Sequence, residues 1–220
     1  MPRILAPFLR AFLMLFGMTM PATPSQDTHE TVDREMSKPL IRGGIVFKNY
    51  CVTCHGDRGD GLARAARLYP GLSLGIKPRP PAYYEKIIRK GGGAVGASLS
   101  MPPWQDELSD EQIVDVLTFL TVLADPVRRG EVVFKTNCVL CHGVRGDGRG
   151  RAAKLYDPPP ANLTLSDKTD EYKEKIIRLG GEAMRRSSAM PAWGDERLTR
   201  AEIADLVAYL RTISVVPHAP

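Results

Sequence analysis

The four cysteines of the chain fall in two short motifs with the same spacing. Each motif is Cys-x-x-Cys-His, and the two copies span Cys51–His55 and Cys138–His142. Such a motif can attach a haem covalently, because the thiols add across the porphyrin vinyl groups and the adjacent imidazole reaches the iron. A redox dithiol or half of a zinc site uses the same cysteine spacing, but two copies with no cysteine left over favour haem. We therefore expect two c-type haems, bound through thioethers to Cys51, Cys54, Cys138 and Cys141.

The histidines of these motifs are the natural proximal iron ligands. His55 and His142 each follow a thioether cysteine directly, so the sequence itself brings the imidazole to the iron. The other two histidines, His29 and His218, lie in the expected terminal tails and have no counterpart in the opposite copy. Ligation of either iron by two histidines is therefore not expected.

Methionine is the remaining candidate for the sixth ligand. Its thioether sulfur suits iron, and His/Met ligation raises the reduction potential by favouring Fe(II). Of the eight methionines, Met101 and Met190 match each other in the two copies, and each precedes a proline that restricts its backbone. We expect Met101 and Met190 to be the distal ligands. Both irons would then have all six positions filled.

The motifs belong to a longer internal repeat. Arg58–Gly61 recurs as Arg145–Gly148 at an offset of 87 residues, and Met101–Trp104 corresponds to Met190–Trp193 at an offset of 89. The offset changes in proline-bearing loops, where the sequence places extra residues before the prolines of copy one and after those of copy two. A duplicated fold tolerates insertions in loops, so we expect two domains of one architecture.

Three helices are expected in each copy, joined by loops rich in glycine and proline. Apolar residues recur at helical spacing, and few segments alternate with a period of two, so the fold class is all-α. A capping box begins the last helix at Ser109 and at Thr199, and Gly91 and Gly180 suit the C-terminal caps of the middle helices. The first and middle helices are expected over residues 39–50, 126–137, 82–90 and 170–179. Because only Val122–Asp125 joins the copies, they should pack side by side.

Each half resembles a class I cytochrome c domain, and together they resemble a two-domain dihaem bacterial cytochrome c. The resemblance covers residues 38–213 and rests on a Gly-x-x-x-Phe helix, the Cys-x-x-Cys-His-Gly motif and a Met-Pro ahead of the last helix. It implies that each domain's helices wrap around one haem. It also implies a proline carbonyl that orients each proximal histidine, with Pro81 and Pro160 as candidates. Finally, it implies that the first and last helices cross through Gly43 and Phe47 against Phe119, and through Gly130 and Phe134 against Tyr209.

The N-terminus has the pattern of a secretory signal peptide. Arg3 and Arg10 flank its start, and the almost wholly apolar run over residues 11–20 is shorter than the roughly 20 residues of a membrane span. We expect export to the periplasm with cleavage near residue 22; a retained N-terminal membrane anchor is the alternative. The expected organisation is a signal peptide at 1–22, a flexible segment at 23–37, cytochrome domains at 38–124 and 125–213, and a tail at 214–220.

The formal charge of +5 does not indicate a nucleic-acid-binding protein. Two positive charges leave with the signal peptide, and residues 23–124 then hold 12 Lys/Arg against 12 Asp/Glu. Residues 125–220 hold 16 against 13, and these basic residues are scattered rather than clustered. The arginine excess of the second half fits a solvated face or a docking surface for an acidic partner.

Two closed haem sites favour electron transfer over catalysis. We expect a periplasmic carrier without a small-molecule substrate, which accepts electrons from a membrane oxidoreductase and donates them to an oxidase or reductase. Peripheral association with the membrane stays open. One alternative is a dihaem redox enzyme of the peroxidase or thiosulfate-oxidising type, which would need one iron with an exchangeable ligand. The other is a cytochrome subunit of a larger dehydrogenase or oxidase complex.

Overall fold

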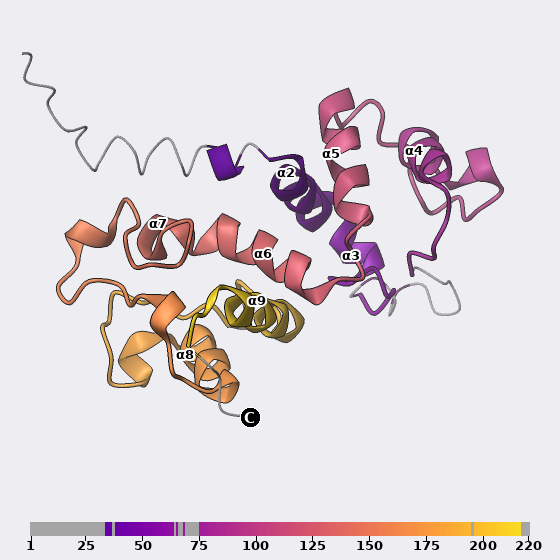
Figure 1. Ribbon diagram of the computed structural model, residues 1–220. Helices are drawn as coiled ribbons and strands as arrows, with labels where there is room; N and C mark the ends of the chain where they lie inside the picture. The colour runs from indigo at the N-terminus through magenta and orange to yellow at the C-terminus, as the bar shows by residue number, and fades with distance from the viewer. Residues whose placement is uncertain are drawn as a thin grey trace, which may run out of the picture.

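The computed structural model describes residues 34–36, 38–63, 65, 68, 75–194 and 196–216 of the 220-residue chain. All regular structure within these residues is helical, which confirms the expected fold class. The helices form two lobes, which we call lobe 1 (residues 38–124) and lobe 2 (residues 125–213) (Figure 1). The expected signal peptide, His29 and His218 lie outside the described residues.

Each lobe repeats one order of helices. Lobe 1 contains α2 (Pro39–Val46), the π-helical turn η1 (Phe47–Cys51), α3 (Val52–His55), α4 (Pro81–Lys90), the 3₁₀ turn η3 (Gly92–Val95) and α5 (Asp110–Leu120). Lobe 2 contains α6 (Pro126–Asn137), α7 (Val139–His142), the 3₁₀ turns η4 (Ala153–Leu155) and η5 (Leu163–Leu165), α8 (Asp170–Ala183) and α9 (Arg200–Ile213). The three main helices expected in each copy are therefore present.

Local sequence signals set the helix ends. The capping boxes form as predicted: the Ser109 side chain accepts from the Gln112 amide at the start of α5, and the Thr199 side chain accepts from the Glu202 amide at the start of α9. Gly91 follows α4 with a φ of 77°, and Gly180 has a φ of 81° near the end of α8. Only glycine adopts such angles without strain, so both glycines break their helices where the sequence predicts.

The first and last helices of each lobe cross at a glycine. A Cβ on Gly43 would lie 1.9 Å from the carbonyl oxygen of Asp115, and a Cβ on Gly130 would lie 1.9 Å from that of Asp205. Only glycine permits this approach, so α2 crosses α5 and α6 crosses α9 backbone to backbone. The expected aromatic contacts are also present, with ring centroids 5.3 Å apart for Phe47–Phe119 and 5.4 Å apart for Phe134–Tyr209.

The lobes pack side by side through α2 and α6, as the short linker predicts. Val132 of α6 belongs to the buried core of lobe 1. Gly44 makes room for it, since a Cβ there would lie 2.4 Å from a Val132 methyl carbon. Asp125, in the linker, caps α6 by accepting from the amides of Val127 and Arg128. The core of lobe 2 is a separate cluster built from its own helices.

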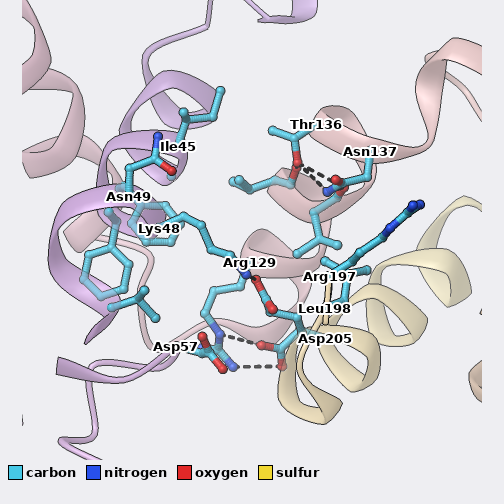
Figure 2. Close-up of a pocket in the computed structure, with 17 residues that line it drawn as sticks. Ile45, Lys48, Asn49, Asp57, Arg129, Thr136, Asn137, Arg197, Leu198 and Asp205 are labelled. Atoms are coloured by element: carbon cyan, nitrogen blue, oxygen red, sulfur yellow. Dashed lines mark hydrogen bonds and ion pairs between the residues drawn. The ribbon is translucent and has the colours of Figure 1, made fainter. Parts of the chain in front are cut away.

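Polar contacts surround this packed boundary, where a cavity of about 200 Å³ lies between the lobes (Figure 2). Its lining includes Lys48 and Asp57 from lobe 1 and Arg129 and Asp205 from lobe 2. The polar contacts that cross the boundary include an ion pair of Lys48 with Glu202, one of Arg58 with Asp205 at 3.3 Å, and a hydrogen bond from Thr199 to Asp57 at 2.6 Å. Ahead of α2, the Glu35 carboxylate lies 3.1 Å from the Lys135 ammonium of α6.

None of the helices in the described ranges combines the length and the apolar character that a membrane span requires.

Candidate haem sites

The two attachment turns have the same backbone geometry. Cys51 ends η1 with φ and ψ of −110° and −33°, and Cys138 follows α6 with −111° and −26°. None of the four cysteines, all of which lie within the described residues, is part of a disulfide. Burial raises the pKa of Cys51 and of Cys138 to about 12, so both stay protonated at neutral pH. Paired free thiols on a helical turn beside a histidine suit addition to the two vinyl groups of one haem.

A tight turn follows each histidine. Gly56 and Gly143 both have a φ of 79°, which reverses the chain directly after the histidine. The histidine carbonyl then accepts from a glycine amide, at 2.8 Å from Gly61 to His55 and at 2.9 Å from Gly148 to His142. Asp60 and Asp147 complete the turns by accepting from the amides of Leu62 and Arg149. The repeated Arg-Gly-Asp segments at residues 58–60 and 145–147 are therefore parts of loop turns.

A backbone carbonyl orients His142. Its Nδ1 lies 3.0 Å from the carbonyl oxygen of Ala161, and donation to this carbonyl leaves Nε2 available for iron. Burial lowers the pKa of His142, although the Ala161 carbonyl opposes this shift, and the lowered pKa favours the neutral imidazole that could bind iron. The expected partner, Pro160, is wrong by one residue. The loop register is set two residues later, where the Leu163 amide donates to the Gly146 carbonyl at 2.6 Å.

The corresponding backbone bond in lobe 1 corrects the expectation that Pro81 orients His55. There the Ile76 amide donates to the Gly59 carbonyl at 2.6 Å, so Ile76 corresponds to Leu163 at the offset of 87. The counterpart of Ala161 is then residue 74, which lies outside the described residues. Pro81 is not that counterpart, because it is already the first residue of α4. The offset therefore changes from 87 to 89 after Ile76 and Leu163. As a result, Pro78–Pro81 and Pro158–Pro160 are not equivalent segments, contrary to what the sequence pattern predicts.

The two methionines lie in loops of one design. The Met101 carbonyl accepts from the Gly92 amide at 2.9 Å, and the Met190 carbonyl accepts from the Gly181 amide at 2.9 Å. Each methionine side chain packs against the core of its own lobe. The structure therefore places Met101 and Met190 in matching positions, tied to the end of the middle helix.

Sequence reasoning missed the glycines that hold these loops. A Cβ on Gly92 would lie 1.9 Å from the carbonyl oxygen of Ser98, and a Cβ on Gly181 would lie 2.1 Å from that of Ser187. Any side chain there would push the methionine loop away from its helix. The signal was present in the repeat, because a Gly-Gly pair ends the middle helix in both copies at the offset of 89.

The residues of each lobe thus fit a covalently bound haem. The donor set consists of two free thiols and an imidazole on one helical turn, with a thioether on a glycine-anchored loop. In lobe 2 the imidazole is also fixed as the neutral tautomer that metals bind. The two lobes offer this set twice with the same backbone geometry.

Comparisons with known proteins agree with this geometry. The family described as "Cytochrome C oxidase, cbb3-type, subunit III" matches the chain twice, over residues 39–120 and 125–210. The cbb3-type cytochrome c oxidase subunit FixP of Azorhizobium caulinodans is 25% identical over 190 residues, covering 81% of this chain and 61% of that protein. The cytochrome bc1 complex cytochrome c subunit of Mycobacterium leprae is 24% identical over 218 residues, covering 90% of this chain and 69% of that protein.

A chain of the reducing HAO-like protein complex of Kuenenia stuttgartiensis is 21% identical, with a TM-score of 0.35, covering 79% of this chain and 96% of that one. A score this low does not bear on the fold. The two family matches coincide with the two lobes and with the two attachment turns. The chain therefore belongs to the cbb3-type cytochrome c oxidase subunit III family, and its lobes are tandem cytochrome c domains that carry two covalently bound haem c groups.

Proposed function

We propose that this dihaem electron-transfer protein works as the cytochrome c subunit of a respiratory complex, between a membrane oxidoreductase and a terminal oxidase. The observation that carries the proposal is the double family match, over two lobes that repeat one haem-binding design. The similar proteins are named as subunits of a cbb3-type oxidase and of a bc1 complex. These comparisons favour the subunit over the free periplasmic carrier, which is the main expectation from the sequence.

The chain's own residues prepare each site for electron transfer. When bound, haem c supplies reversible one-electron Fe(III)/Fe(II) chemistry. The cysteine pairs hold it covalently, and the Ala161 carbonyl keeps His142 in one orientation, so that little structure has to reorganise as the charge changes. The apolar cores beside Met101 and Met190 keep water away from that side of each site.

Ligation by Met101 and Met190 is part of the proposal. Its support is the matching hydrogen bond from Gly92 and from Gly181 to the methionine carbonyls. A peroxidase-type or thiosulfate-oxidising enzyme needs one site that differs from the other, with a replaceable sixth ligand. The two methionine loops instead share one anchoring pattern, which favours two closed sites.

Substitution of one methionine at a time tests the ligands. Met101→His should lower one of the two reduction potentials and leave the other nearly unchanged, because imidazole favours Fe(III) more than a thioether does. Met190→His is the matched variant and should lower the other potential. Spectroelectrochemical titration of the holoprotein measures both values. A variant that moves both potentials equally, or neither, would contradict the assignment.

Two further measurements separate the candidate functions. Ferrous protein that binds carbon monoxide at one haem would favour the enzyme, whereas closed sites should not bind it. Purification of the full chain from its own cells in mild detergent tests the assembly. Co-purification with oxidase or bc1-type subunits is the expected result, and recovery of the chain alone would favour the free carrier.

A further inference from the structure

The turns that follow the two proximal histidines have the same fold but different surroundings. We name residues 56–62 the haem-1 loop and residues 143–156 the haem-2 loop. Residues 143–149 are the counterpart of the haem-1 loop, and residues 150–156 correspond to residues 63–69, most of which lie outside the described residues. In the haem-1 loop, Asp57 accepts a hydrogen bond from Thr199 and Arg58 pairs with Asp205, both across the lobe boundary. The haem-1 loop is therefore held against lobe 2.

The haem-2 loop has no such neighbour among the described residues. Arg145, the counterpart of Arg58, has an 84% exposed side chain, and its ion pair is with Asp147 of its own loop at 3.7 Å. Val144 replaces Asp57 and therefore lacks a carboxylate. Figure 1 shows α7 and the following loop at the outer end of lobe 2, while α4 lies at the opposite end of the molecule. This loop is thus free to meet another molecule.

The haem-2 loop also carries one cation without a basic counterpart in lobe 1: Arg145, Arg151 and Lys154 match Arg58, Arg64 and Arg67 in sequence, whereas Arg149 has no such match. Arg149 occupies the position of Leu62, since each amide donates to the aspartate of its turn. Over the described part of the chain no ion pair involves Arg149, Arg151 or Lys154. The exposed cations of the loop are Arg145, Arg149, Arg151 and Lys154.

These cations are tied to the haem attachment turn by backbone bonds. The Gly150 amide donates to the Cys141 carbonyl at 3.1 Å, and the Ala152 amide donates to the Leu140 carbonyl at 2.9 Å. A Cβ on Gly150 would lie 2.4 Å from the Leu140 carbonyl oxygen, so the loop lies directly on the turn. Whatever binds these cations is therefore held beside haem 2.

We propose that the haem-2 loop is the docking surface for an acidic redox protein, and that this partner exchanges electrons with haem 2 rather than with haem 1. The inference rests on the proposed electron-transfer function and adds which lobe meets the partner and with what charge. Unpaired cations at one site attract an acidic protein and raise its association rate. With a reduced partner, one electron passes to the haem-2 iron, which goes from Fe(III) to Fe(II) as the partner is oxidised. No bond is made or broken, and no proton moves.

Stopped-flow reduction of the oxidised holoprotein by a reduced, acidic flavodoxin tests the proposal. Arg149→Glu and Arg151→Glu should each lower the second-order rate at low ionic strength by about threefold to tenfold. Lys86→Glu makes the same charge change on an exposed residue of α4 in lobe 1 and should change the rate less than about twofold. The difference between the variants should shrink as salt is added.

The outcomes separate the docking surface from the function. If Lys86→Glu slows the reaction as much as the loop variants do, or if the loop variants react like the parent, the docking proposal is overturned. It is also overturned if these arginines are needed for binding to anionic lipid vesicles or for self-association in sedimentation, while the flavodoxin rate does not depend on them. Haem content and redox titration of each variant check the proposed function separately, since a failure there would appear without any flavodoxin.

Discussion

Lobe 1 and lobe 2 contain the same arginine–aspartate pair at the same helix crossing, in different surroundings. Arg42 bonds Asp115 through two nitrogens, at 2.6 and 2.9 Å, and its side chain is 33% exposed and also reaches Glu111. Arg129 bonds Asp205 in the same way, at 2.7 and 2.9 Å, but its side chain is 9% exposed. The second pair is buried because lobe 1 covers it.

Because lobe 1 covers the Arg129–Asp205 pair, this pair is part of the lobe boundary. Arg129 also donates to the Leu123 carbonyl in lobe 1, and Asp205 also receives Arg58 from the haem-1 loop. Asp115 is buried too, but its arginine lies at the surface of lobe 1. The Arg42–Asp115 pair thus lies within lobe 1, whereas its counterpart Arg129–Asp205 contacts both lobes. Helix α6 also contacts both lobes, because its Val132 belongs to the core of lobe 1. The core of lobe 1 therefore includes a side chain of lobe 2, whereas among the described residues the core of lobe 2 includes none of lobe 1.

Removal of one haem at a time should produce the largest difference between the two lobes. Cys138→Ala with Cys141→Ala should cost helical content in both lobes, because a loosened α6 withdraws Val132 from the core of lobe 1. Cys51→Ala with Cys54→Ala should unfold lobe 1 and leave lobe 2 folded. Small domains bury a modest share of their surface, so each lobe needs the apolar surface of its haem. Circular dichroism with limited proteolysis measures the effect; equal, independent losses would contradict the shared role of α6.

Neutralisation of the two aspartates should give the next largest difference. Asp205→Asn leaves the buried Arg129 without its carboxylate and should destabilise the folded state by about 3 kcal/mol. Asp115→Asn is the matched variant and should cost less, because Arg42 is open to water and keeps Glu111. Urea unfolding of the holoproteins, followed by circular dichroism, gives both free energies. A larger loss for Asp115→Asn would show that the coverage by lobe 1 does not decide the effect.

Gly44→Ala should give the smallest effect, confined to the boundary. Its added methyl group would meet Val132 and should cost about 1–3 kcal/mol through overpacking. Val132→Ala in the same chain should recover part of that loss, since the two sites are in contact and their effects should not add. Thermal unfolding of the single and double variants tests the coupling. Additive losses would mean that α2 and α6 do not meet through this pair.

Most of the site was predictable because it is built from local signals repeated twice. The cysteine motifs, the capping boxes and the glycines at 91 and 180 act within a few residues of themselves, and the structure confirms the helix ends they predict. The matching positions of the two methionines followed from the offset of 89 that also relates Trp104 to Trp193. The carbonyl partner of His142 could not be found in this way, because the Leu163–Gly146 bond joins loop segments whose register the proline pattern misrepresents.

By itself the sequence determined two haem-binding lobes and their helices, since these follow from short spacings and from comparing one copy with the other. The ligands proposed for each haem rest on the same comparison. The sequence could not separate Arg58 from Arg145, which occupy the same place in the same repeated motif. Only the tertiary structure decides that Arg58 meets Asp205, 147 residues away, while Arg145 faces solvent. The physical reason is that each lobe has one neighbour on one side, and a repeat carries no local mark of which side that is.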